Sequence, residues 1–364
     1  MLGPQAQSLQ VVRKGRGYYM NNLLSYSGIN TKVRAMESNL ISKEEYTKIA
    51  NFDSVADFTA FLADHPGYRE IFRNYDDAAL HRGDVEKLLS HALYLDFAKI
   101  YRFANAEQKR DLDLLFFRYE VTILKSCIRL VYSEEKDYDL NVFDPFFIKH
   151  LKINVPALSA SSSMEEYIRN LKGTQYYPFF EKLQASGNPL SSFDYEMHLD
   201  QYYFRKAWKL KEKLLTGENY RAFTSRLGTE IDLLNIMWIY RSKSIYNLEA
   251  ADILSYILPI TYKLTKEQLT RMATTNSMDE FMDIMKNTAY KEMYPALLNH
   301  TMESKYKQLV RKVYQSNKRK YPSSMATAND YLYQKELEIG RLITALECIR
   351  YRLSPQNRLS YILQ

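Results

Sequence analysis

The chain has 364 residues, enough for two or three domains that each bury a hydrophobic core. Its 50 Lys and Arg residues outnumber 43 Asp and Glu residues, and the net charge of +7 suits either an acidic partner or an anionic membrane surface. This excess lacks the dense basic clustering of a dedicated nucleic-acid binder. Cys127 and Cys348, the only cysteines, belong to no CxxC pair, so a disulfide scaffold or a zinc site is not expected.

The composition and patterning predict an all-α protein, because Gly is scarce and few stretches alternate as strands do. Residues 1–17 are polar and basic, lack the apolar core of a signal peptide and are expected to form a flexible leader. A helix is predicted from Tyr18 to about Leu40, and Ser42 with Glu45 then predicts a capping box. No stretch approaches the ~18 apolar residues of a membrane span.

A short motif then occurs three times, roughly 110 residues apart. It reads S-V-A-D-F-T-A-F-L at Ser54, S-M-E-E-Y-I-R-N-L at Ser163 and S-M-D-E-F-M-D-I-M at Ser277. In each copy Ser precedes an acidic residue by three positions, which predicts a helix that starts with a capping box. An aromatic residue and a Leu or Met, four apart, share one buried helix face. The motif tyrosines follow, at Tyr68, Tyr176 and Tyr290.

Long helices follow the first two motifs, predicted at about 83–105, 107–131, 193–215 and 220–241. Apolar residues lie at −3, +1, +4 and +8 from Glu120, and at the same offsets from Glu230. The last helix repeats the +1, +4 and +8 positions from Glu338, but Lys335 occupies the −3 position.

These repeats predict three helical units, at 18–140, 141–244 and 245–364. Three small bundles of this kind could pack in a row or around a pseudo-threefold axis. The unit is longer than a thin solenoid repeat such as a tetratricopeptide.

No pattern typical of catalysis is present. The six His residues lack an H-E-x-x-H arrangement, and neither a phosphate-binding Gly loop nor a G-x-S-x-G elbow occurs. Glu120, Glu230 and Glu338 are interpreted as solvated or interface-flanking carboxylates and not as an acid–base pair. We therefore expect no enzyme activity, metal or cofactor.

A basic stretch late in the chain is the candidate partner surface. It is a set of five cationic residues: Arg311, Lys312, Lys318, Arg319 and Lys320. These residues could touch an acidic partner, or they could form an ordinary solvated helix face. The sequence alone leaves both interpretations open.

Three segments resemble one protein family. The stretch I-N-T-K-V-R-A-M-E-S-N-L-I-S-K-E-E-Y at 29–46 is similar to the opening of the C subunit of prokaryotic V/A-type ATPases. T-E-I-D-L-L-N-I-M-W-I-Y-R at 229–241 resembles that family's E-x-D-x-x-N-I helix, and Y-I-L-P-I-T-Y-K-L-T at 256–265 resembles its Y-L-I-P-G-G-Y-L turn. Ile260 and Thr261 stand where the family commonly has Gly.

The resemblance implies a funnel of three similar helical bundles about a pseudo-threefold axis, the counterpart of the d subunit of vacuolar proton pumps. It implies a non-catalytic rotor subunit at the cytoplasmic face of the membrane, peripheral and without a membrane span. Such a subunit is a socket between the central-stalk subunits and the proteolipid rotor ring, and it passes torque for ATP-driven transport of protons or sodium ions. The alternative is a helical-repeat scaffold for another soluble protein; a nucleic-acid binder and an enzyme are less well supported.

Overall fold

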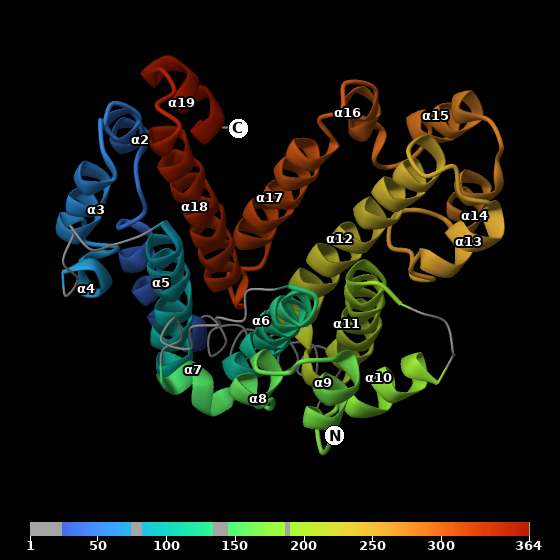
Figure 1. Cartoon of the computed structure of the whole chain (residues 1–364), viewed down its shortest axis with the longest axis horizontal. Coiled ribbons are helices and arrows are strands. Elements are labelled where there is room, and N and C mark those ends of the chain that lie inside the picture. Colours follow the sequence, from blue (N-terminus) through green and yellow to red (C-terminus); the bar gives the residue numbers. More distant parts are fainter. Residues whose placement is uncertain (1–23, 74–81, 134–144, 186–189, 364) are drawn as a thin grey trace, which may run out of the picture. The chain divides into compact units, whose positions relative to one another are not determined.

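The computed structural model describes residues 24–73, 82–133, 145–185 and 190–363, and every regular element within them is helical (Figure 1). The all-α prediction is therefore confirmed for this part of the chain. Contacts divide the protein into two compact units. The first holds residues 1–109, 217–222 and 314–364, and the second holds 110–216 and 223–313. The predicted boundaries at 140 and 244 remain predictions, and the predicted leader lies outside the described residues.

The first unit is built around the long helix α18. Residues 24–37 are helical. The helices that follow wholly within this unit are α2 (Lys43–Ala50), α3 (Val55–Asp64), α4 (Arg69–Phe72), α5 (Arg82–Phe103), α18 (Ala326–Arg350) and α19 (Pro355–Leu363). Helix α18 packs against α5 and α19, and also contacts α2 and α3 (Figure 1). The core between them joins Phe58 and Leu62 of α3 to Leu342 and Leu346 of α18, all fully buried.

The second unit contains two groups of short helices and the long helix α11. Its own elements are α7 (Pro145–His150), α8 (Val155–Ser159), α9 (Met164–Asn170), α10 (Tyr177–Gln184), α11 (Ser192–Leu214), α13 (Ala250–Tyr256), α14 (Lys266–Thr274), α15 (Met278–Lys286), η2 (Lys291–Met293) and α16 (Tyr294–Leu298). Three further helices have residues in both units: α6 (Ala106–Val131), α12 (Gly217–Ser244) and α17 (Met302–Lys320). The four long helices predicted at 83–105, 107–131, 193–215 and 220–241 correspond to α5, α6, α11 and α12, with ends within three residues.

The three motif serines all cap a helix, as predicted. Ser54, Ser163 and Ser277 each accept a hydrogen bond from the backbone N–H three residues later, which satisfies a donor that the first turn cannot pair internally. Only Ser54 completes the reciprocal capping box, with Asp57.

The reciprocal bond was a wrong prediction for the other two copies. The Glu166 carboxylate instead accepts from the Ser162 N–H at 2.8 Å, and Glu280 accepts from the Thr275 hydroxyl at 2.6 Å. A second donor beside each carboxylate is the physical reason. Sequence spacing alone does not show that donor.

Candidate functional site

Two of the five predicted partner-surface residues lie in the part of α17 that belongs to the second unit. Lys312 is exposed, and its Nζ pairs with Glu292 at 2.8 Å, while Lys305 Nζ reaches the same carboxylate at 3.3 Å. Arg311 is half-buried, and its Nε has no hydrogen-bond partner among the described residues. Exposed pairs of this kind contribute little to stability, so Lys312 stays accessible to a partner.

The other three lie in the part of α17 that belongs to the first unit. Lys318 is half-buried and forms ion pairs with Glu37 and with Asp330, which is 1% exposed. Its charge is thus used in ion pairs within the first unit. Arg319 and Lys320 are exposed and form no ion pair within the described residues. Their role as a partner surface remains a prediction.

The three glutamates interpreted as solvated or interface-flanking are buried, so that interpretation was wrong. Exposed fractions are 2% for Glu120, 5% for Glu230 and 4% for Glu338. A buried carboxylate requires partners, because removing its charge from water is costly. Two of these glutamates, together with Asp232, lie at the centre of polar clusters that involve the three motif tyrosines.

The first cluster is formed by Glu338 of α18. Its Oε1 accepts from the Tyr68 hydroxyl at 2.6 Å, and its Oε2 accepts from the Ile41 backbone N–H at 2.6 Å. Tyr68 is fully buried, and burial is the main reason that its pKa rises well above the usual range, with Glu338 adding to the shift. The carboxylate therefore fixes both the start and the end of the α2–α4 group against α18.

Lys335 explains the break in the predicted apolar stripe. It is 1% exposed, its Nζ pairs with Glu338 at 2.9 Å, and the same Nζ lies 3.6 Å from the centre of the Tyr68 ring. The cation thus neutralises the buried carboxylate and contacts the face of its tyrosine partner. What looks like a misplaced charge in the sequence is an internal ion pair.

The third motif tyrosine belongs to an equivalent cluster around Asp232 of α12. This fully buried carboxylate accepts from the Tyr290 hydroxyl at 2.9 Å and from three consecutive backbone N–H groups. Those donors are Tyr262 at 3.0 Å, Lys263 at 2.6 Å and Leu264 at 3.1 Å. Burial raises the pKa of Asp232, and these hydrogen bonds offset part of that rise.

Two further residues of α12 position the 256–265 segment. Asn235 exchanges two hydrogen bonds with the Leu258 backbone, at 2.8 and 3.0 Å. A Cβ on Gly228 would lie 2.5 Å from Cγ of Tyr262, so only Gly lets the turn approach the helix this closely. The segments 229–241 and 256–265 therefore form one locked helix–turn pair.

The second motif tyrosine lies near Glu120 of α6. Burial raises the pKa of Glu120 to about 7, against the opposing effects of the Lys152 side chain, the Lys152 backbone N–H and the Tyr176 hydroxyl. Neither Oε1 of Glu120 nor the Tyr176 hydroxyl has a hydrogen-bond partner of normal geometry in the described residues. Like the other two clusters, this one brings together a buried carboxylate, a motif tyrosine and a backbone N–H group. Its tyrosine and carboxylate do not form a hydrogen bond of normal geometry.

The three clusters share one layout. In each, the motif tyrosine of a short-helix group meets a carboxylate of a long helix that lies outside the predicted unit of that tyrosine. Tyr68 pairs with Glu338, Tyr176 faces Glu120, and Tyr290 pairs with Asp232.

Glu230, which the apolar offsets matched to Glu120, is not the carboxylate that meets a motif tyrosine. Its carboxylate pairs with Arg226 at 3.1 and 3.2 Å, one helical turn away. Asp232, two residues later, occupies the position equivalent to Glu120 and Glu338. A clue was present in the sequence, because the residues at +1 and +4 from Asp232, Leu233 and Ile236, are also apolar.

These clusters hold the backbone and leave no group of metal ligands. No set of three or more His, Cys, Asp or Glu side chains in the described ranges is placed to bind a metal ion. Within the same ranges, no helix is both long and apolar enough to cross a bilayer. Cys127 and Cys348 are buried and free. In two of the clusters the carboxylate is a fixed hydrogen-bond acceptor, as the bonds to Glu338 and Asp232 show.

Residues 29–361 match the model of the ATP synthase (C/AC39) subunit family. The chain belongs to this family. It is 24% identical over 330 residues to the A-type ATP synthase C subunit of Methanococcoides burtonii, covering 87% of this chain and 88% of that protein. The A-type ATP synthase C subunit of Thermococcus kodakarensis is 22% identical over 341 residues, covering 91% and 88%. That of Methanosphaera stadtmanae is 22% identical over 333 residues, covering 87% and 82%.

All three clusters lie within the part of the chain that matches the ATP synthase (C/AC39) subunit family. The resemblance to the V/A-type ATPase C subunit is confirmed. The segments that carried it include Ile41, Asp232, Asn235 and the 262–264 turn, which are the backbone and side-chain partners described above.

Proposed function

We propose that this chain is a non-catalytic rotor subunit of a V/A-type ATPase. It forms a socket that links the central stalk to the proteolipid rotor ring and passes torque between them. The observation that carries this proposal is the family match over residues 29–361, together with relatives that are named as C subunits of A-type ATP synthases. The subunit would be peripheral, at the cytoplasmic face of the membrane.

The polar clusters support a role in which stiffness matters. An adaptor that passes torque must keep its short-helix groups fixed on its long helices while force is applied. Hydrogen bonds to a buried carboxylate are short, directional and stronger than neutral ones. Glu338 and Asp232 each hold two separate points of a short-helix group, which resists both sliding and rotation of that group.

The proposed architecture is a funnel of three similar bundles about a pseudo-threefold axis. Its support is the recurrence of the same parts in three places. Each time, a capped short helix, a buried tyrosine and a carboxylate on a long helix come together. Three-way duplication of one unit would produce this recurrence.

The test is an affinity purification of the tagged full-length chain from detergent-solubilised membranes of cells that make it. The co-purifying proteins are identified by mass spectrometry, and an untagged strain serves as the control. Recovery of central-stalk subunits with the proteolipid ring is the expected result. If only soluble proteins are recovered under conditions that keep the ATPase intact, the rotor proposal fails and the scaffold alternative replaces it.

A further inference from the structure

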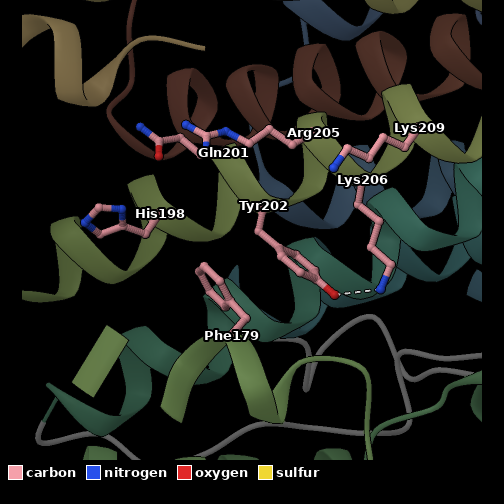
Figure 2. Close-up of a pocket in the computed structure, with 7 residues that line it drawn as sticks. All are labelled: Phe179, His198, Gln201, Tyr202, Arg205, Lys206 and Lys209. Carbon is pink, nitrogen blue, oxygen red and sulfur yellow. Dashed lines mark hydrogen bonds between the residues drawn. The ribbon is translucent and has the colours of Figure 1, made fainter. Parts of the chain in front are cut away.

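A pocket of about 340 Å³ lies in the second unit beside α10 and α11 (Figure 2). Six of its lining residues come from α11. The lining consists of Phe179, His198, Gln201, Tyr202, Arg205, Lys206 and Lys209. It contains four basic side chains and two aromatic rings, and no acidic side chain. The polar clusters do not use any of these residues as a hydrogen-bond partner.

One side of the pocket is held in place by its own contacts. The Tyr202 hydroxyl donates to the Gln175 carbonyl at 2.9 Å and accepts from Lys206 Nζ at 2.7 Å. The ring centres of Phe179 and Tyr202 lie 4.8 Å apart, and the two rings form an aromatic wall. Gln201 Nε2 donates to the Tyr256 carbonyl at 2.5 Å. A site fixed in this way loses little conformational entropy when a ligand binds.

Unlike the aromatic wall, most of the cations around it are not held by contacts within the described residues. Arg205 and Lys209 are exposed and form no ion pair among the described residues. Lys213 is also exposed and unpaired there, so positions 205, 209 and 213 form a stripe along one face of α11. Other basic residues of this unit do have partners, as Lys125 has in Asp200 and Arg129 has in Glu196.

Lys206 is the one pocket cation with a strong link to the interior. Burial lowers its pKa, and the negative charge of Glu120 partly opposes that shift. Glu120 does not line the pocket. An incoming anion would thus meet four basic side chains with no competing carboxylate on the pocket wall.

We propose that the pocket and the stripe together bind an acidic segment of another protein chain. An apolar side chain of that segment packs on Phe179 and Tyr202, and its Asp or Glu residues pair with Arg205, Lys206 and Lys209. The stripe spans about 12 Å along the helix, which is longer than one phosphate group and matches about four residues of extended chain. The aromatic wall gives such a segment an apolar anchor that a small anion does not need.

This inference rests on the proposed function, because the partner would be another subunit of the same complex. The experiment places the photo-crosslinker p-benzoylphenylalanine at position 179 of the full-length tagged chain in living cells. Cross-linked peptides are identified by mass spectrometry after irradiation. The expected product joins position 179 to a segment of another chain that carries several Asp or Glu residues.

A charge variant with a matched control makes the result specific. The triple variant should lower the cross-link yield roughly tenfold or more, because three pairing cations are lost. It combines Arg205→Gln, Lys206→Gln and Lys209→Gln. The control changes the exposed Lys43, Lys266 and Lys291 to Gln, which alters the net charge equally, and should leave the yield unchanged.

The outcomes separate this proposal from the proposed function. If the tagged chain recovers the stalk and ring subunits but both variants cross-link equally well, the pocket proposal is overturned and the rotor proposal stands. A cross-link to lipid, or to residues 134–144 of the chain itself, also overturns the pocket proposal. If no ATPase subunit is recovered while the charge-dependent cross-link to an acidic segment persists, the rotor proposal alone fails.

Discussion

Asp232 offers the sharpest test of how the short-helix groups are held. Its buried carboxylate accepts four hydrogen bonds, three from consecutive backbone N–H groups and one from Tyr290. Asp232→Ala leaves all four donors without this partner. An unsatisfied buried donor costs about 1–3 kcal/mol, and water can reach some of these donors because the turn is only partly buried. We expect the free energy of opening of the 262–264 turn to fall by about 3–5 kcal/mol.

Milder substitutions at the same site should give a graded series. Asp232→Asn keeps one acceptor oxygen and loses the charge, so we expect a loss of about 2 kcal/mol. Tyr290→Phe removes only one of the four hydrogen bonds and should cost about 1 kcal/mol.

Hydrogen–deuterium exchange of the 262–264 amides measures this quantity directly, because exchange from a protected amide reports local opening. Asp232→Ala should speed their exchange about a hundredfold or more. Tyr246→Phe, at a side chain 59% exposed, is the control and should change nothing. If Asp232→Ala keeps its helical circular dichroism and its exchange stays within a few-fold of the wild type, the carboxylate does not hold the turn.

Three other substitutions test the remaining contacts. Because the raised pKa of Glu120, about 7, lets the native state keep a proton that the unfolded chain releases, the stability that this site contributes falls as pH rises. As the pH rises from about 5 to 8, the free energy of unfolding of Glu120→Gln, measured with urea, should therefore increase by about 2–3 kcal/mol relative to that of the wild type. Gly228→Ala forces the Tyr262 ring to move and should cost about 1–2 kcal/mol, measured in the same way. Lys335→Met leaves Glu338 as an unpaired buried charge and should cost about 3–5 kcal/mol, seen as a lower Tm.

Each of these three has an internal control. A pH-independent difference between Glu120→Gln and the wild type would contradict the raised pKa. Gly340→Ala should stabilise by about 0.5–1 kcal/mol, because nothing lies within 4 Å of the added Cβ; equal effects at Gly228 and Gly340 would refute the close approach. Adding Glu338→Gln to Lys335→Met should reverse at least half of the decrease in Tm. A further decrease in Tm would argue against the ion pair.

Local chemistry in the sequence was enough to predict the three motif helices with their starting points and the four long helices. Ser54, Ser163 and Ser277 cap helices because a hydroxyl acceptor lies beside backbone N–H groups only a few residues away. The apolar periodicity likewise gave α5, α6, α11 and α12 with ends within three residues. These signals depend on neighbours in the chain, so one sequence contains them in full.

Only the tertiary structure decided which carboxylate each motif tyrosine meets. Periodicity assigns a residue to a helix face, but it does not say which helix packs on that face. Tyr68 therefore pairs with Glu338, 270 positions away, and Asp232 takes the place that the pattern gave to Glu230. Lys335 looked like a break in an apolar stripe because its charge is explained only by Glu338 and the Tyr68 ring. Buried charges need partners in space, and a sequence orders its residues only along the chain.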